Sequence, residues 1–405
     1  MAARTGKLAL CIALAAIGFG TLGSAAALAK APPPTFFGVD AWSPPSSGEF
    51  GRMHGGKVGT YRHFLYWRSV EACRGCRDWR GMDAVIGDAA RRHVRVLPFV
   101  WGTPSYIARD PKTLPISKPG LKAYAALIRD LVRRYGKSGG FWKTHPQLPK
   151  TPLAGVQVWN EPSHPYFSNS SKAADYVKLL KAAAKAVRST DSRMKVVVAG
   201  IPNTGGKKLV TYVKELYGVR GFRKASDVVA LHPYAVNPRA VFDVVKRVRS
   251  IMNSHGDGAK PIWITETGWA SNKGGYFSAG SPQAQAKILT QLYKGLIERR
   301  KKSKIGLVAW FAWRDRNLQP GERDGWVTHT GLFEVDGTPK PAWNALVKVT
   351  GGRAGSGRLP SSSGPPPCEG PTCCPAIVPP GLPIICGPLA QLDLEGDRSP
   401  ARGVR

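Results

Sequence analysis

The stretch GVQVWNEPSHPYF, residues 155–167, places an acidic side chain at the end of an apolar run. The run from Gly155 to Trp159 is mostly apolar and β-branched, which is typical of a buried strand. Asn160 and Glu161 follow, and Pro162 then prevents continued pairing because proline lacks a backbone N–H. Charged groups are seldom buried unless they are paired or take part in chemistry. We therefore expect Glu161 to emerge at the edge of a sheet.

The same form recurs along the chain between residues 35 and 350. Short apolar runs alternate with amphipathic segments whose apolar residues lie three and four positions apart. The expected strands are TFFGVDAW (35–42), KVGTYRHF (57–64), VRVLPFVWG (94–102), AGVQVWNEP (154–162), KVVVAGIP (195–202), DVVALHPYA (227–235), PIWITETGW (261–269) and IGLVAWFAW (305–313). The clearest expected helices span 120–136, 171–189, 240–256 and 281–302.

Strand and helix alternate eight times over about three hundred residues, which predicts an α/β fold of the (β/α)8 or TIM-barrel type. The strands are apolar throughout, as in a parallel sheet buried on both faces. A doubly wound open sheet is the alternative. No GxGxxG motif follows the first expected strand, however, and eight units suit a closed barrel better.

The composition changes after residue 350, where the expected barrel domain (30–350) ends. Residues 351–367, GGRAGSGRLPSSSGPPP, have the composition of a flexible linker. The tail at 368–405 is too short and too rich in proline to bury a core, so we expect it to be disordered or held by disulfides. Its four cysteines allow three pairings that the sequence does not distinguish: Cys368, Cys373, Cys374 and Cys386.

The first 29 residues have the features of an export signal. Arg4 and Lys7 precede the apolar run LALCIALAAIGFGTLG, and Ala27 and Ala29 provide a small-x-small cleavage site. An uncleaved membrane anchor is the alternative, because the apolar run approaches the length that spans a bilayer. We expect cleavage after Ala29. The mature protein is then expected to be secreted, either released or retained at the cell surface.

Cys73 and Cys76 form a CxxC pair in EACRGCRDW. A zinc site would need two further ligands nearby, and a thioredoxin-like site would need a different fold around it. Export favours oxidised cysteines. A short disulfide in a surface loop is the preferred interpretation.

Charge is the most unusual feature of the composition. The chain has 59 Lys and Arg against 26 Asp and Glu, a formal net charge of +33, and nearly all of the excess lies in residues 30–350. Such a field attracts polyanions, which include acidic polysaccharides and cell-envelope polymers, although a merely solvated basic surface is the alternative. Nucleic acid is not expected, because no nucleic-acid-binding motif is present. Basic residues that follow expected strands are Arg109, Lys112, Arg314, Arg316 and Arg323.

Two glutamates end expected strands of the barrel. Glu161 ends the fourth strand and Glu266, in PIWITETGW, ends the seventh. Active sites of TIM barrels lie at the carboxyl ends of the strands, so both side chains should project into one mouth. A lone glutamate at such a position commonly caps a helix or pairs with a neighbour. Two of them flanked by aromatic residues predict a catalytic pair.

The motifs Asn160-Glu161-Pro162 and Glu266-Thr267-Gly268-Trp269 resemble those of the retaining glycoside hydrolases of clan A. The resemblance covers residues 35 to about 350, with families 39 and 5 nearest. It implies that Glu266 is the nucleophile and Glu161 the acid/base in the hydrolysis of β-glycosidic bonds of a poly- or oligosaccharide. It implies no metal and no cofactor.

The resemblance also implies roles for residues around the pair. Arg62, taken to end the second strand, and Tyr234 would hold Glu266, and Asn160 would contact the sugar 2-hydroxyl. The alternatives are that Arg62 pairs with a surface acid and that His232 and Tyr234 serve only to pack the barrel. Further residues expected to line the groove are His232, His164, Trp101 and Trp310, whereas Trp313 is expected to be structural.

Two other classes of function remain open on the sequence. One is an exported glycan-binding or cell-wall-associated protein whose barrel has lost turnover. The other is a structural protein that charge alone attracts to the cell envelope. The presence of both glutamates argues against the first class, because binding alone does not require two close carboxylates. A protein of the second class would bind in a salt-sensitive way and hydrolyse nothing.

Overall fold

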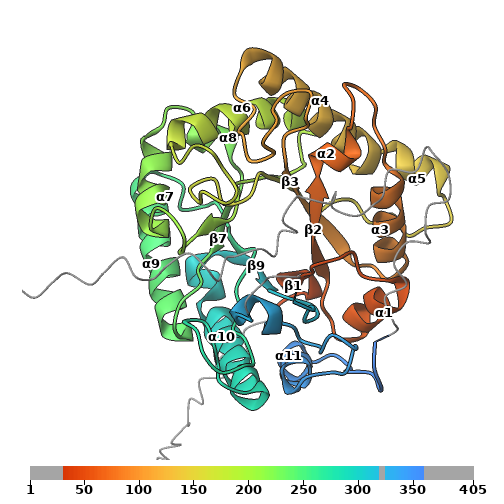
Figure 1. Cartoon of the computed structure of the whole chain (residues 1–405), viewed down its shortest axis with the longest axis vertical. Helices are drawn as coiled ribbons and strands as arrows, with labels where there is room; N and C mark the ends of the chain where they lie inside the picture. The colour runs from red at the N-terminus through yellow and green to blue at the C-terminus, as the bar shows by residue number, and fades with distance from the viewer. Residues whose placement is uncertain (1–30, 319–323, 360–405) are drawn as a thin grey trace, which may run out of the picture. The chain divides into compact units, whose positions relative to one another are not determined.

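The computed structural model describes residues 31–318 and 324–359. Within these residues, strands occupy the centre and helices surround them (Figure 1). No helix in these ranges is long and apolar enough to cross a bilayer. The predicted signal segment, Arg323, and the predicted linker and tail from residue 360 onward lie outside the described residues.

All strand pairs of the central sheet are parallel. The described residues form one sheet in the order β5-β4-β3-β2-β1-β9-β8-β7-β6. Its strands are β1 (Phe37–Asp40), β2 (Thr60–Tyr66), β3 (Arg95–Trp101), β4 (Val156–Val158), β5 (Val196–Val197), β6 (Ile201–Pro202), β7 (Val229–His232), β8 (Ile262–Ile264) and β9 (Ile305–Trp310). They are mostly buried, as a sheet covered on both faces requires.

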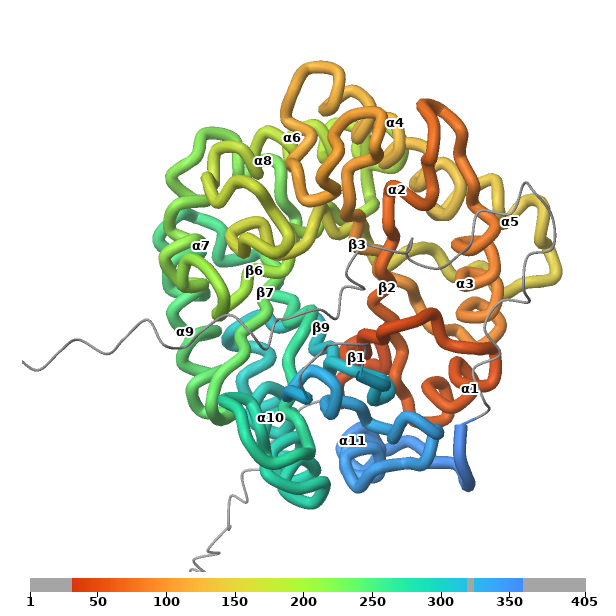
Figure 2. Tube along the Cα trace, in the orientation of Figure 1, coloured from red at the N-terminus to blue at the C-terminus, as the bar shows by residue number. Residues whose placement is uncertain are grey.

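The strand order begins with β5 and ends with β6, and these two short strands together fill a single strand position of the barrel. Strands β5 and β6 are separated in the chain by residues 198–200 alone. Val197 bridges Val228 in parallel, Val198 N donates to Val228 O at 3.0 Å, and Ile201 pairs with Leu231 in β7. The sheet therefore closes on itself, which confirms the predicted (β/α)8 barrel and excludes the doubly wound alternative. The path of the chain in Figure 2 follows the same ring.

The helices lie between successive strands and bury their apolar sides against the sheet. Their bounds are α1 (Ser47–Gly55), α2 (Trp67–Val70), α3 (Arg80–Arg91), α4 (Lys118–Tyr135), α5 (Gly140–Thr144), α6 (Ala173–Arg188), α7 (Leu209–Gly218), α8 (Phe222–Ala225), α9 (Pro238–Ser254), α10 (Pro282–Ser303) and α11 (Pro341–Thr350). Two short 3-10 helices are η1 (Pro34–Phe36) and η2 (Trp326–His329).

Local sequence explains where several helices begin. Ser117, Asn237 and Ser281 each accept a hydrogen bond from the third residue that follows, and proline occupies the first turn of α4, α9 and α10. Both features satisfy or remove backbone N–H groups that have no partner at a helix start. Ser46 and Glu49 form a capping box at α1. The four helices expected from the sequence correspond to α4, α6, α9 and α10.

Two smaller predictions can be compared with the structure. Cys73 and Cys76 form a disulfide, as predicted. The first part of the predicted linker, residues 351–359, packs against the barrel. Arg52 donates to the carbonyls of Ala354, Ser356 and Gly357, and Leu359 is buried. The predicted linker is therefore wrong for residues 351–359, which continue the packed domain.

Candidate active site

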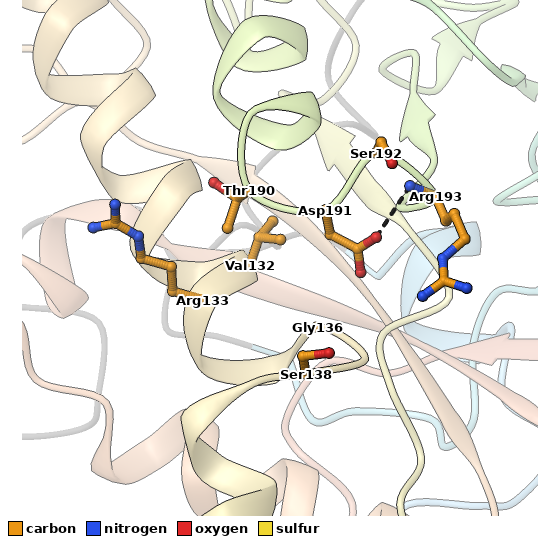
Figure 3. Close-up of a pocket in the computed structure, with 8 residues that line it drawn as sticks. All are labelled: Val132, Arg133, Gly136, Ser138, Thr190, Asp191, Ser192 and Arg193. Carbon is orange, nitrogen blue, oxygen red and sulfur yellow. Dashed lines mark hydrogen bonds between the residues drawn. The ribbon is translucent and has the colours of Figure 1, made fainter.

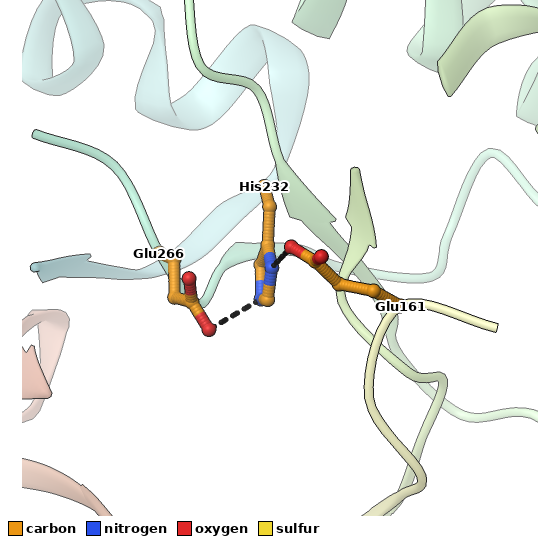
Figure 4. A group of neighbouring side chains, drawn as sticks. All are labelled: Glu161, His232 and Glu266. Carbon is orange, nitrogen blue, oxygen red and sulfur yellow. Dashed lines mark hydrogen bonds and ion pairs between the residues drawn. The ribbon is translucent and has the colours of Figure 1, made fainter. Parts of the chain in front are cut away.

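Glu161 and Glu266 converge at the carboxyl ends of the barrel strands. Glu161 follows β4, Glu266 follows β8, and His232 is the last residue of β7. A carboxylate oxygen from each glutamate and a ring nitrogen of His232 all lie within 4.8 Å of one another, as Figure 4 illustrates. Both glutamates are buried. This carboxylate spacing is typical of retaining glycosidases and too short for the inverting class, in which carboxyl groups lie about 6.5–9.5 Å apart.

The backbone around Glu161 takes an uncommon conformation. Trp159 has a φ of 69° and Glu161 a φ of 38°, both in the left-handed region that non-glycine residues seldom adopt. The indole N–H groups of Trp159 and Trp101 both donate to the carbonyl of Phe167, at 2.9 and 2.8 Å. These two bonds fix the loop that follows the acid. Strain of this kind persists where the surroundings enforce it, and it is concentrated at functional sites.

Glu266 accepts hydrogen bonds at both carboxylate oxygens. Nη1 of Arg62 lies 2.5 Å from Oε1, and the hydroxyl of Tyr234 donates to Oε2 at 3.0 Å. Burial raises the pKa of Glu266 to about 7, and the Arg62 charge opposes that rise. Donors at both oxygens favour the ionised carboxylate, which is the form a nucleophile requires.

Arg62 organises this part of the barrel. Its Nε donates to Oε1 of Gln157 at 2.8 Å and its Nη2 to Oδ1 of Asn160 at 2.6 Å. The side chain is fully buried, and its guanidinium packs 3.8 Å from the ring centroid of Phe99. The predicted contact with Glu266 is present. The predicted place at a strand end is wrong, because Arg62 lies within β2, paired in register with Asp40.

Glu161 contacts His232 rather than a cation. Nδ1 of His232 lies 2.6 Å from Oε1 of Glu161. Burial, and then the neighbouring charge of Glu266, raise the pKa of Glu161 well above its ordinary value. Burial and the Arg62 charge lower the pKa of His232, so the imidazole is neutral at neutral pH. Of the two carboxyl groups, Glu161 is therefore the one whose surroundings favour the protonated form.

Asp40 is a member of the site that the sequence analysis missed. It ends β1, is buried, and forms an ion pair with Nη1 of Arg62. Burial raises its pKa, and Arg62 opposes that effect. The sequence did contain a signal, since an acid ends an apolar run in FFGVDAW just as Glu161 does in GVQVWNE.

Both tryptophans expected to line the groove, Trp310 and Trp101, are buried in the structure. Trp310 is fully buried and donates to Thr330 O at 2.8 Å, so it offers no surface for a sugar. Trp101 is 6% exposed, is tied to Phe167 and stacks on Tyr66 with ring centroids 5.8 Å apart. Trp313 is structural as expected, with its Nε1 donating to Glu49 at 3.0 Å.

A different aromatic cluster lies beside Glu266. Its members are Trp42, Tyr234, Phe277, Phe311 and Trp326. The rings of Trp42 and Phe311 meet edge to face with centroids 4.6 Å apart, and the ring centroids of Trp326 and Tyr234 lie 5.1 Å apart. Because Tyr234 donates to Glu266, this wall is continuous with the carboxylate pair. Trp42 and Trp326 are only partly buried, so they present ring surface that sequence reasoning had assigned to Trp310.

His164 does not join the carboxylates. Its ring is 1% exposed, and its Nδ1 accepts from the backbone N–H of Tyr166 at 3.1 Å. A Cβ at Gly205 would overlap the imidazole, which shows how closely the loop covers it. The ring is thus enclosed between its own loop and the loop that contains Gly205, and the structure does not bring His164 together with the two glutamates.

A family model described as the glycosyl hydrolase catalytic core matches residues 136–342. This chain belongs to that family. The matched range includes both Asn160-Glu161-Pro162 and Glu266, the motifs that carry the resemblance noted in the sequence. Comparison with curated protein sequences finds no match.

Solved structures share the fold of this glycosyl hydrolase core. A family 39 glycoside hydrolase from Bacteroides cellulosilyticus has a TM-score of 0.60 and 19% identity, with 79% of this chain and 64% of that chain covered. A family 39 enzyme from Xanthomonas axonopodis pv. citri has a TM-score of 0.61 and 18% identity over 82% of this chain and 69% of that chain.

A more distant neighbour is an exo-β-1,4-mannosidase from an Opitutaceae bacterium, with a TM-score of 0.56, 14% identity and coverage of 78% of this chain and 58% of that chain. The chain therefore spans less than two thirds of the length of the Bacteroides and Opitutaceae proteins. At these identities the likeness concerns the fold.

The basic residues expected near the mouth have separate surroundings. Arg314 pairs with Glu49 at 2.8 Å, and Lys112 lies 3.9 Å from Asp110. Arg109 is exposed, and the guanidinium of Arg316 lies 5.0 Å from the ring centroid of Trp42. Of these described residues, Arg316 is the one that contacts the aromatic wall of the glycosyl hydrolase core.

A cleft of about 350 Å³ lies away from the carboxylates, between the last turn of α4 and the loop after α6 (Figure 3). Its lining is polar and includes Arg133, Ser138, Thr190 and Arg193. Asp191 is directed to its own loop, where Oδ1 accepts from the Arg193 N–H at 3.0 Å. Its lining contains one carboxylate, that of Asp191.

Glu161, His232 and Glu266 are the types of residue that bind divalent metals. Arg62 already supplies a positive charge 2.5 Å from Glu266, and a protonated Glu161 would have to lose its proton before it bound a cation. The donor set therefore fits proton transfer better than metal binding.

Proposed function

We propose that the protein is an O-glycosidase that cleaves β-glycosidic bonds in a poly- or oligosaccharide with retention of anomeric configuration. The observation that carries this proposal is the close pair of buried carboxylates with opposite surroundings. Glu266 accepts from Arg62 and Tyr234, whereas Glu161 contacts neutral His232. Two carboxyl groups that differ in this way suit a nucleophile and an acid.

In the first step, an oxygen of Glu266 attacks the anomeric carbon and the bond to the leaving oxygen breaks. Glu161 transfers its proton to that oxygen, so the leaving sugar departs as an alcohol. Tyr234 and Arg62 keep Glu266 ionised and aimed. Asn160 accepts from Arg62 through Oδ1, so its amide N–H groups remain donors for a substrate hydroxyl.

In the second step, Glu161 is a carboxylate and acts as a base. It takes a proton from a water molecule whose oxygen attacks the anomeric carbon, and the bond to Glu266 breaks. The site then returns to its starting protonation. Water attacks the face from which the first sugar left, so two inversions give net retention.

The aromatic wall supports a sugar substrate. Sugars present C–H faces that stack on aromatic rings, and the wall contains two tryptophans that are only partly buried, Trp42 against Phe311 and Trp326 against Tyr234. The known relatives named above include a mannosidase, and a β-xylosidase from Caulobacter crescentus shares the fold at 18% identity. This variety supports a β-glycoside without selecting the sugar.

We further propose that the protein is exported and meets an anionic cell envelope or an acidic glycan. The support is the signal-like sequence of residues 1–29 and the net charge of +33. The end of α10 and the residue after it form one exposed part of this positive charge. The exposed basic side chains there are Arg299, Lys301, Lys302 and Lys304. A weakly catalytic glycan-binding protein is the alternative function.

A panel of aryl β-glycosides tests the proposal and separates it from this alternative. Wild type should release aryl alcohol from at least one sugar, and Glu266→Ala should not, while both bind the same glycan. Arg133→Met, on the outer surface of α4, is the matched control and should hydrolyse as wild type does. Equal release by wild type and Glu266→Ala, or binding without release, would contradict the proposal.

A further inference from the structure

A buried chain of hydrogen bonds runs from Arg62 to Glu161 through side chains with no assigned role. Nε of Arg62 donates to Oε1 of Gln157 at 2.8 Å, and Nε2 of Gln157 lies 3.2 Å from Oγ1 of Thr265. That hydroxyl lies 3.0 Å from Nε2 of His232, whose Nδ1 lies 2.6 Å from Glu161. Gln157, Thr265 and His232 are each 0% exposed, so solvent does not compete for these bonds.

The direction of each hydrogen bond in the chain follows from two neighbours of Gln157 whose roles are fixed. Arg62 can only donate, so the Gln157 atom beside it must be the amide oxygen. The amide nitrogen of Gln157 also faces the carbonyl of Val198 at 3.2 Å, and a carbonyl can only accept. Both neighbours require the same orientation of the amide. Gln157 therefore donates its second N–H to Thr265.

The hydroxyl hydrogen of Thr265 determines which nitrogen of the His232 imidazole is protonated. Its hydroxyl has one hydrogen, and Gln157 already occupies an acceptor site on the oxygen. Among the described residues, the remaining hydrogen-bond partner of Oγ1 is Nε2 of His232. If Nε2 instead donated to Oγ1, this buried hydroxyl hydrogen would have no acceptor among the described residues; it is therefore assigned to Nε2, which accepts it and carries no proton of its own.

We propose that Gln157 and Thr265 are positioning residues that hold neutral His232 as the Nδ1–H tautomer and thereby confine the acid proton of Glu161 to Oε2. Nδ1–H donates to Oε1 of Glu161, so Oε1 is reserved as an acceptor. The inference rests on the proposed role of Glu161 as the acid/base. It adds which oxygen delivers the proton and which residues determine this.

The ring has little freedom to escape this arrangement. A Cβ at Gly200 would overlap the imidazole, so the backbone there lies against the ring. The charged and titratable groups around it are Arg62 from β2, Glu161 after β4 and Glu266 after β8, with Nε2 3.5 Å from Oε1 of Glu266. Arg62 and burial both disfavour a second proton on the imidazole.

The tautomer has a consequence for catalysis. A donor at Oε1 stabilises the carboxylate that Glu161 becomes after it releases its proton. In the opposite tautomer, Nδ1 would accept the Glu161 proton and Nε2–H would face Glu266. The proton would then be held between Glu161 and His232 instead of facing the leaving oxygen.

Thr265→Val tests the chain because it keeps the shape and removes the hydroxyl. We expect kcat/KM to fall about tenfold on substrates with poor leaving groups and little on activated aryl glycosides. The alkaline limb of the pH profile should move upward, because Glu161 then holds its proton more tightly. Thr265→Ser should restore both, and Thr290→Val, on the outer helix α10, should change neither.

The tautomer itself can be measured in the wild-type protein, and a variant is needed only to assign the signals. Nitrogen-15 spectra of labelled protein, with His232→Asn to assign the signals, should show a protonated Nδ1 and an unprotonated Nε2. A protonated Nε2, or equal losses on all leaving groups in Thr265→Val, would overturn the inference. Loss of the proposed function would appear differently, as hydrolysis that survives in Glu266→Ala.

Discussion

Nη1 of Arg62 lies 2.5 Å from Oε1 of Glu266, in a position where the guanidinium has no contact with solvent. The same group contacts Asp40 and Asn160, so three elements of the barrel depend on one cation. A buried charge is tolerated only where its partners satisfy it. Arg62 thus links the stability of the barrel mouth to the ionisation of Glu266.

Replacing Arg62 with lysine keeps the charge and removes the planar set of donors. We expect kcat/KM to fall by about 100-fold, as on loss of an electrostatic donor in other active sites. The variant should also unfold at a lower temperature. Steady-state kinetics and thermal unfolding check this, with Arg133→Lys as the exposed control. Wild-type kinetics in Arg62→Lys would show that the planar set of guanidinium donors is unimportant.

Tyr234→Phe removes one donor from Glu266 and leaves the ring in place against Phe277 and Trp326. The hydroxyl lowers the pKa of Glu266, so its removal should raise that pKa. Since the nucleophile must be ionised, the acidic limb of kcat/KM should move to higher pH. A pH–rate profile measures this, and an unchanged or lower acidic limb would contradict the assigned hydrogen bond.

How much of this site the sequence could predict depends on the feature. The alternation of strands and helices predicted the barrel, and the barrel placed Glu161 and Glu266 at one mouth, because their position needs no knowledge of side-chain direction. Trp310 and Phe311 show the opposite case. Neighbouring residues at a strand end face opposite sides, so an error of one position exchanges a buried ring for one beside Glu266.

Contacts between distant segments were also beyond the sequence. The place of Arg62 within β2 follows from its register with Asp40 in β1, and register depends on the packing of the whole sheet. The chain from Gln157 through Thr265 to His232 joins three strands in the same way. The sequence shows these polar residues within apolar runs, but it does not show which residues they contact.

Glu161→Gln should stabilise the protein at alkaline pH. The pKa of Glu161 is raised in the folded state, so the contribution of this group is favourable below the ordinary pKa and is lost as pH rises through the folded value. Glutamine carries no charge at any pH. The melting temperature of Glu161→Gln should therefore match wild type near pH 4 and exceed it increasingly toward pH 9.

The control for this prediction is Glu298→Gln, at an exposed position on α10. Its melting temperature should follow wild type across the same pH range, because this side chain is largely exposed to solvent. A constant difference between Glu161→Gln and wild type at all pH values would show that Glu161 titrates normally.

Two tryptophans should separate binding from stability. Trp326→Ala removes ring surface from the aromatic wall, and we expect KM to rise about three- to tenfold. Trp310→Phe removes the buried bond to Thr330 O and should cost about 1–3 kcal/mol of unfolding free energy with KM unchanged. Kinetics and denaturant unfolding of both variants check this. A raised KM in Trp310→Phe would indicate that Trp310 contributes to substrate binding and would contradict this prediction.

The most direct test of the account is a covalent label at the nucleophile. A 2-deoxy-2-fluoro glycoside with an activated leaving group slows the second step more than the first, so the sugar should accumulate on the nucleophile. Peptide mass spectrometry should then place the added mass on Glu266, and the wild-type product from an unmodified substrate should keep its anomeric configuration. A label on Glu161, or an inverted product, would contradict the proposed mechanism.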